Sequence, residues 1–157
     1  MKNNKGFTLI ELLAVIVVLA IVTVIASSSI LPYMSNARVD AFEVEATNIV
    51  KSAQSAMDLY NMGTVKLKGN TASCKKENTI CFSVQELIDL GIYNDKTGNF
   101  KGYVNVDITN STNPTYYLYL QKGAEFYING GTETDYVDSD SVKSGDGNIS
   151  EGCSCSE

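Results

Sequence analysis

The chain contains no His and no Trp among its 157 residues. His is the commonest general base near neutral pH and a frequent zinc ligand, so its absence counts against many hydrolytic and metal-dependent enzymes. The composition therefore favours a protein that is not an enzyme, and we expect no cofactor and no metal.

Positive charge is scarce in the C-terminal part, where residues 132–157 contain Lys143 as their single basic residue. The same stretch holds seven acidic residues, and the chain has a formal net charge of −6. An acidic surface repels phosphate. We therefore expect no direct binding of nucleic acid.

Charge is also nearly absent from the N-terminal part, where Glu11 is the only charged residue between Lys5 and Arg38. Fourteen of the twenty residues from Phe7 to Ala26 are Phe, Leu, Ile or Val. These side chains favour membrane insertion by several kcal/mol in total, about ‑0.3 to ‑0.6 kcal/mol each, which outweighs a cost of about 3 kcal/mol for the carboxylate. A helix over residues 7–31 would span about 37 Å, enough to cross the hydrocarbon core.

The flanking charges predict the direction of this segment. Lys2 and Lys5 precede it, and no acidic residue accompanies them. Basic flanks stay on the cytoplasmic side, so residues 32–157 are expected outside the cytoplasmic membrane.

Two ordinary explanations of the segment stay open. A secretory signal peptide could end at Ala26, before Ser27, although this apolar stretch is longer than usual and contains a carboxylate. A plain membrane anchor could use Thr8 and Glu11 as a capping box at the helix start. That box accounts for the carboxylate but leaves the Gly6-Phe7 pair unexplained.

The stretch Lys5-Gly6-Phe7-Thr8-Leu9-Ile10-Glu11-Leu12-Leu13 resembles the class III signal of type IV pilins and pseudopilins. The resemblance implies that a prepilin peptidase cuts between Gly6 and Phe7 and methylates the new Phe7 amine. It also implies that Glu11 pairs with the Phe7 amine of a neighbouring subunit. Where many pilins carry Pro near the end of the apolar span, this chain has Ser28, and its nearest Pro is Pro32.

The patterns described below predict an α+β fold, in which a long N-terminal helix with a membrane-spanning first half packs on a small antiparallel sheet, and this layout also resembles the pilin fold. The expected parts are a leader at 1–6, a hydrophobic transmembrane and assembly helix at 7–31, an amphipathic second half at 32–62, and an extracellular globular part at 63–157. The implied function is a structural subunit of a type IV pilus or related filament, with identical or related subunits as partners. It would lie in the cytoplasmic membrane first and in a cell-surface filament after assembly. The alternatives are a pseudopilin of a type II secretion or DNA-uptake machine and, with a conventional signal peptide, a secreted binding domain.

Helical spacing continues beyond the apolar segment to about Met62, and Gly63 suits a helix end. We predict one long helix with a bend or break near residues 27–29 and Pro32, and two separate helices are the alternative. The predicted inward face consists of Phe42, Ala46, Ile49, Ala53, Ala56, Met57 and Tyr60.

The remaining residues predict a loop, a short helix and three strands. Residues 63–82 are expected to form a loop, and a second capping box at Ser83 and Glu86 starts a short helix that ends at Gly91. Alternating apolar residues then predict strands near 103–109, 116–121 and 125–128, with Lys122-Gly123 joining the last two as a hairpin. Tyr117, Tyr119, Gln121 and Tyr127 are expected on the wet face, where the tyrosines either stabilise the sheet or form an adhesive surface.

The four cysteines suggest disulfides if this part lies outside the membrane. Cys74 with Cys81 would close the smallest loop and is our first expectation, whereas Cys153 and Cys155 are too close together to bond without strain. Both C-terminal cysteines could instead reach back to the 74–81 region, and by resemblance many pilins do this. A thiolate metal site lacks a zinc-like spacing.

Two acidic stretches suggest calcium ligands. Asp138-Ser139-Asp140 and Asp146-Gly147-Asn148 place oxygen atoms at alternating positions, but the Gly and final Glu of an EF-hand are missing. We expect a solvated acidic loop.

Overall fold

The computed structural model describes residues 7–69, 72–96, 98–132 and 141–153. Gly6, Asp138, Asp140 and Cys155 therefore lie outside the described residues. The chain forms two compact units, Met1–Arg38 and Val39–Glu157, and each is described by itself.

Helix α1 (Leu9–Asn61) runs through both units. The helix continues through Pro32, so the alternative of two separate helices is wrong. Its end confirms the predicted role of Gly63, which has a φ of 74°. The amide of Gly63 donates to the Tyr60 carbonyl, and that of Thr64 donates to the Leu59 carbonyl. These two bonds form a Schellman motif, which requires a residue with positive φ at this position.

In the second unit, α1 buries the face that the helical spacing predicted. Phe42, at one end of this face, is fully buried, and its ring centroid lies 6.0 Å from that of Phe100 and 5.7 Å from that of Phe126. Tyr60, at the other end, is partly buried. The buried members are Phe42, Ala46, Ile49, Ala53, Ala56 and Met57, joined by Val50, which the pattern had not included.

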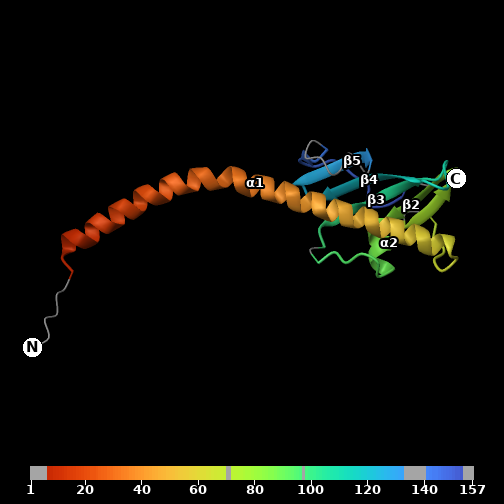
Figure 1. Cartoon of the computed structure of the whole chain (residues 1–157), viewed down its shortest axis with the longest axis horizontal. Coiled ribbons are helices and arrows are strands. Elements are labelled where there is room, and N and C mark those ends of the chain that lie inside the picture. Colours follow the sequence, from red (N-terminus) through yellow and green to blue (C-terminus); the bar gives the residue numbers. More distant parts are fainter. Residues whose placement is uncertain (1–6, 70–71, 97, 133–140, 154–157) are drawn as a thin grey trace, which may run out of the picture. The chain divides into compact units, whose positions relative to one another are not determined.

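A six-stranded antiparallel sheet in the order β1-β2-β3-β4-β5-β6 packs against this face of α1 (Figure 1). Each strand pairs with its neighbour in the chain. The strands are β1 (Ser73–Lys76), β2 (Thr79–Ser83), β3 (Phe100–Asp107), β4 (Thr115–Lys122), β5 (Phe126–Thr132) and β6 (Lys143–Ser144). The long helix and antiparallel sheet confirm the predicted α+β, pilin-like fold.

The three strands expected from alternation are β3, β4 and β5. Their inward residues on β3 and β4 include Val104, Val106, Leu118 and Leu120, which are fully buried. Lys122 pairs with Phe126 across the predicted hairpin, and Gly123 has a φ of 52° in the turn. Burial on one face therefore sets the register of the central strands.

The prediction of a loop over residues 63–82 is wrong at its C-terminal end, which contains β1 and most of β2. The strands are only four and five residues long, and the exposed half of β1 consists of Lys75 and Lys76. Because the two strands are short and β1 contains two lysines, the sequence shows no alternation of apolar and polar residues that would predict them. Charged side chains of this kind are common on edge strands because they discourage pairing with other chains.

The predicted short helix is α2 (Val84–Asp89), and the Ser83 hydroxyl accepts a hydrogen bond from the Glu86 amide at 3.1 Å. The return half of the predicted capping box does not form. The Ser83 amide donates to the Ala72 carbonyl instead, and the buried Glu86 carboxylate lies 2.8 Å from Lys68 Nζ. This contact with Glu86 raises the pKa of Lys68.

The C-terminal segment, residues 145–153, covers part of the sheet face opposite α1. Gln121, which was expected to be wet, is buried there. Its Nε2 donates to Asp146 Oδ1 at 2.6 Å, and its Oε1 accepts from the Ile149 amide at 3.0 Å. A Cβ on Gly147 would overlap the Tyr127 ring. The alternation correctly assigned Gln121 to the outer face of the sheet. It could not show that the C-terminal segment covers this face around Gln121.

Gln121→Met should lower the free energy of unfolding by about 1–3 kcal/mol, because it leaves the buried Ile149 amide without its partner. Chemical denaturation of the full chain in detergent, followed by tyrosine fluorescence, measures this change. Gln85→Met is the matched control because Gln85 is exposed, and it should change stability by less than about 0.5 kcal/mol. Equal effects of the two substitutions would contradict the assigned role of Gln121.

The expected Cys74–Cys81 bond is wrong, because Cys81 is bonded to Cys153. Cys74 and Cys81 are cross-strand neighbours on β1 and β2, so the nearest thiol in sequence is also close in space. Cys81 nevertheless alternates with the core residues Ile80 and Phe82 and therefore faces away from α1, toward the returning C-terminal segment. Cys74 is also disulfide-bonded, and no cysteine in the described part of the chain is free.

Candidate processing and assembly site

The first unit presents a continuous apolar helix surface. Within the described residues, α1 contains one stretch long and apolar enough to cross a membrane, Leu9–Ser27, with a mean hydropathy of 3.1 and no part of it buried. Phe7, just before the helix, is 89% exposed. Soluble monomers rarely expose an apolar surface of this size, so this surface indicates contact with lipid or with other protein chains.

The start of α1 is held by the predicted capping box. The amide and hydroxyl of Thr8 donate to Glu11 Oε2 at 2.8 and 2.9 Å. The Glu11 amide in turn approaches the Thr8 hydroxyl oxygen at 3.4 Å. The Glu11 carboxylate thus accepts from the Thr8 amide, which has no partner inside the helix, and it lies at the positive end of the helix dipole.

The geometry of the Glu11 carboxylate leaves one of its oxygens for another donor. Both bonds from Thr8 end on Oε2, and Glu11 is exposed. Within the described residues, Oε1 therefore remains to accept a bond from a cationic group. The pairing of Phe7 with Glu11 across subunits stays a prediction that the resemblance implies, and the structure places Phe7 directly before the capped turn.

Other polar side chains in the apolar segment satisfy themselves locally. The Thr23 hydroxyl donates to the Leu19 carbonyl at 2.9 Å, and the Ser27 hydroxyl donates to the Thr23 carbonyl at 2.7 Å. Such bonds to the preceding turn remove the cost of an unpaired hydroxyl in an apolar environment. Glu11 is the one charged group within Leu9–Ser27.

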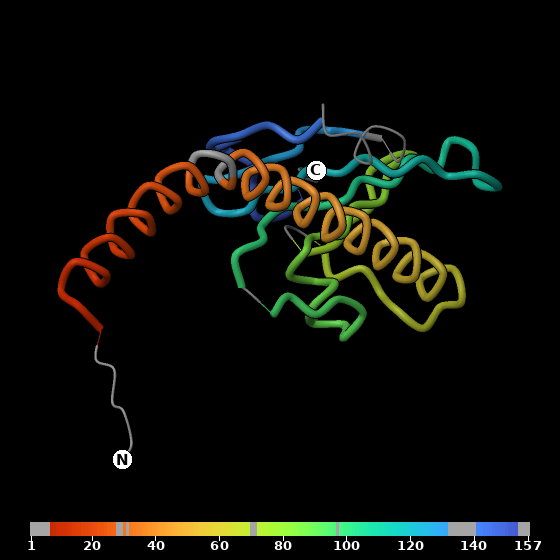
Figure 2. Tube along the Cα trace, turned by 60° about the vertical axis from the view of Figure 1, so that its left-hand side comes forward, coloured from red at the N-terminus to blue at the C-terminus, as the bar shows by residue number. Residues whose placement is uncertain are grey.

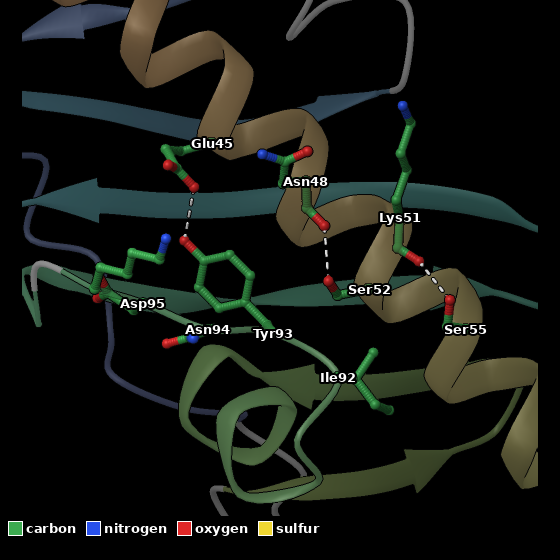
Figure 3. Close-up of a pocket in the computed structure, with 10 residues that line it drawn as sticks. Glu45, Asn48, Lys51, Ser52, Ser55, Ile92, Tyr93, Asn94 and Asp95 are labelled. Carbon is green, nitrogen blue, oxygen red and sulfur yellow. Dashed lines mark hydrogen bonds between the residues drawn. The ribbon is translucent and has the colours of Figure 1, made fainter.

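A polar groove lies in the second unit between α1 and the loop after α2, with a volume of about 470 Å³ (Figure 3). In this groove the Tyr93 hydroxyl donates a hydrogen bond to Glu45 Oε2 on α1 at 3.0 Å. Burial and this bond to Glu45 raise the pKa of Tyr93 above its ordinary value. Helical spacing did not predict this groove, because Tyr93 and Glu45 are far apart in the sequence.

The structure offers no candidate metal site among the residues it describes, since no three His, Cys, Asp or Glu side chains are grouped suitably. Asp146, one of the possible calcium ligands, accepts bonds from the Asn148 amide and from Gln121. These bonds lower the pKa of Asp146. The other possible ligands, Asp138 and Asp140, lie outside the described residues.

The outer tyrosines act at least in part as sheet contacts. Tyr103 and Tyr119 are cross-strand partners on β3 and β4, and their rings stack with centroids 4.7 Å apart. Tyr117 and Tyr127 are half-buried. Stacked aromatic pairs of this kind stabilise a sheet beyond their buried area.

Comparison with known proteins gives one match. Residues 1–27 match the family described as the prokaryotic N-terminal methylation motif. This class III signal is characteristic of type IV pilins and pseudopilins, so the chain carries the N-terminal signal of a structural subunit family that is processed by prepilin peptidase and assembles with other pilin subunits. The motif and the apolar helix together indicate anchoring in a membrane before assembly. No curated protein and no solved structure matches the chain.

Proposed function

We propose that this protein is a structural subunit of a type IV pilus or a closely related filament. The observation that carries the proposal is the methylation motif over residues 1–27 on an exposed apolar helix. The helix would form the filament core, and the globular part of residues 63–157 would coat it.

Processing would precede assembly. A prepilin peptidase would cut between Gly6 and Phe7 and methylate the Phe7 amine, releasing the leader of residues 1–6. Until then the chain would remain in the cytoplasmic membrane, with Lys2 and Lys5 inside and residues 32–157 outside.

Glu11 would then set the axial position of each incoming subunit. An unpaired charge in an apolar core is costly, whereas a paired one is tolerated. The new ammonium group on Phe7 of a neighbouring subunit would bind Glu11, while the capping bonds from Thr8 occupy Oε2. A subunit in the wrong register would leave both charges unpaired, so the pair would select one register.

Immunogold labelling of surface filaments with antibodies against residues 63–157 tests the filament role. Label along the whole fibre is the expected result for a major subunit. Label at the tip alone would indicate a minor subunit. A chain confined to the membrane fraction, with no labelled fibre, would contradict the pilus proposal and favour a pseudopilin of a secretion or DNA-uptake machine, since the N-terminal motif serves both groups.

A further inference from the structure

Two tripeptides in the second unit have the form Asn-x-Ser/Thr, in which the middle residue is not Pro. They are Asn110-Ser111-Thr112 and Asn148-Ile149-Ser150. This pattern marks acceptors of N-linked glycans when it lies on the surface of an exported protein. We propose that Asn110 is a glycan attachment site and that Asn148 is not.

The first tripeptide lies in the loop between β3 and β4, which projects past the end of the sheet as the teal segment in Figure 2. All of residues 109–113 are exposed. The loop reads Thr-Asn-Ser-Thr-Asn-Pro-Thr from residue 109, so no side chain in it contributes to the apolar core. A transferase can therefore approach the loop without disturbing the fold.

The backbone of this loop presents the Asn110 side chain in a defined turn. The Asn110 carbonyl accepts from the Asn113 amide at 3.1 Å, and Asn110 Oδ1 accepts from the Thr112 amide at 3.2 Å. The hydrogen bond uses Oδ1 and leaves the Nδ2 atom for the sugar. It also brings the residue at the third position of the tripeptide close to the acceptor amide.

Asp107 fixes the start of the same loop. Its Oδ1 accepts from both the amide and the hydroxyl of Thr109, at 2.8 and 2.6 Å, and these bonds lower the pKa of Asp107. The loop is thus anchored at its base, while the tripeptide itself stays on the surface.

The second tripeptide is held against the sheet. Ile149 is 7% exposed, and its amide donates to the buried Gln121. Asn148 has a φ of 50°, and its amide donates to Asp146. Four residues beyond Ile149, the Cys81–Cys153 bond closes the segment onto β2. An enzyme could bind this tripeptide in an extended form only after the segment had left the sheet.

The glycan donor required is a lipid diphosphate-linked oligosaccharide. Asn110 Nδ2 would form a bond to the anomeric carbon of the first sugar, and the bond from that carbon to the phosphate oxygen would break. The lipid diphosphate leaves with the electron pair, and a basic group of the transferase takes the proton lost from Nδ2. The inference rests on the proposed function only in that the loop must face the outside of the membrane.

Peptide mass spectrometry of the full-length chain from its own host tests the proposal, with fragmentation that keeps glycans attached. A sugar mass localised to Asn110 is expected. It should be lost in Asn110→Gln and in Thr112→Val, and it should remain in the matched controls Ser111→Ala and Asn148→Gln. Labelling of lysines on intact cells with a membrane-impermeant reagent shows independently whether residues 32–157 are outside.

An unmodified Asn110 in a chain that is labelled from outside would overturn this inference and leave the proposed function intact. A sugar on Asn148, or on a hydroxyl of the loop with Asn110 bare, would also overturn it. A chain that is neither labelled from outside nor modified would contradict both the inference and the proposed function.

Discussion

Glu11→Ala should leave the chain in the membrane and prevent it from joining a filament. Insertion is retained because the substitution removes the one charged group from Leu9–Ser27 and makes its transfer to lipid more favourable. Assembly is lost because the Phe7 amine of the neighbouring subunit would then be buried without a partner.

The expected size of the assembly defect follows from the cost of breaking a buried ion pair. Removing one partner costs about 3–5 kcal/mol. A loss of about 3 kcal/mol lowers the equilibrium constant for adding a subunit by roughly a hundredfold. Extraction with alkaline buffer measures insertion, and the amount of chain in sheared surface filaments measures assembly.

Two further substitutions separate the charge of Glu11 from its capping bonds. Glu11→Gln can still cap the helix, since Gln serves in a capping box, but it carries no charge. Thr8→Val removes both hydroxyl bonds of the box and keeps the carboxylate. We expect Glu11→Gln to fail in assembly as Glu11→Ala does, and Thr8→Val to retain more assembly than either. Normal filaments with Glu11→Gln would show that capping, and not charge, is what Glu11 contributes.

Replacing both Cys81 and Cys153 by Ser should lower the free energy of unfolding of the oxidised chain by about 4 kcal/mol. The bond joins residues separated by 72 positions, and closing a loop of that length restricts the unfolded chain by about this amount in the entropy model of disulfides. The double substitution avoids leaving a single reactive thiol beside Cys74. Denaturation of the full chain in detergent, followed by tyrosine fluorescence, measures the loss.

The same bond connects the C-terminal segment to the outer face of the sheet, so the variant should also expose that segment. Proteolysis near residues 145–153 should be faster in the variant than in the oxidised wild type. Adding a reductant to the wild type supplies the control, because it opens this bond together with the disulfide of Cys74 and should reduce stability at least as far. If the double variant were as stable as the wild type, the Cys81–Cys153 bond would contribute nothing to stability, and Gln121 and the apolar core would hold the fold without it.

The parts of the fold that depend on local pattern could be predicted from the sequence. The helical spacing identified the inward face of α1, and alternation identified β3 to β5. Both were possible because an element buried on one face carries apolar residues at the repeat of that element, about 3.6 residues in a helix and two in a strand. The helix ends at Gly63 and Gly91 were also predictable, because both glycines adopt the positive φ that the ends require.

The features that depend on distant segments could not be predicted. From the sequence alone, Gln121 is expected to be exposed, and only the structure shows that Asp146 and Ile149 contact it. Cys81 is likewise expected to bond Cys74, and only the structure shows that Cys153 lies close enough to bond it instead. The candidate site was the easier case because its parts lie close together in the sequence. Thr8 and Glu11 are three residues apart, so the capping box follows from one turn of helix.

The mass of the mature chain's N-terminal peptide tests the central claim most directly. The peptide should be recovered from the membrane or surface fraction of the native host and sequenced by fragmentation. A chain that begins at Phe7 and carries one methyl group on its amine is the predicted result. A chain that begins at Ser27, or one that retains Met1 to Gly6, would contradict processing at the class III signal and with it the proposed assembly.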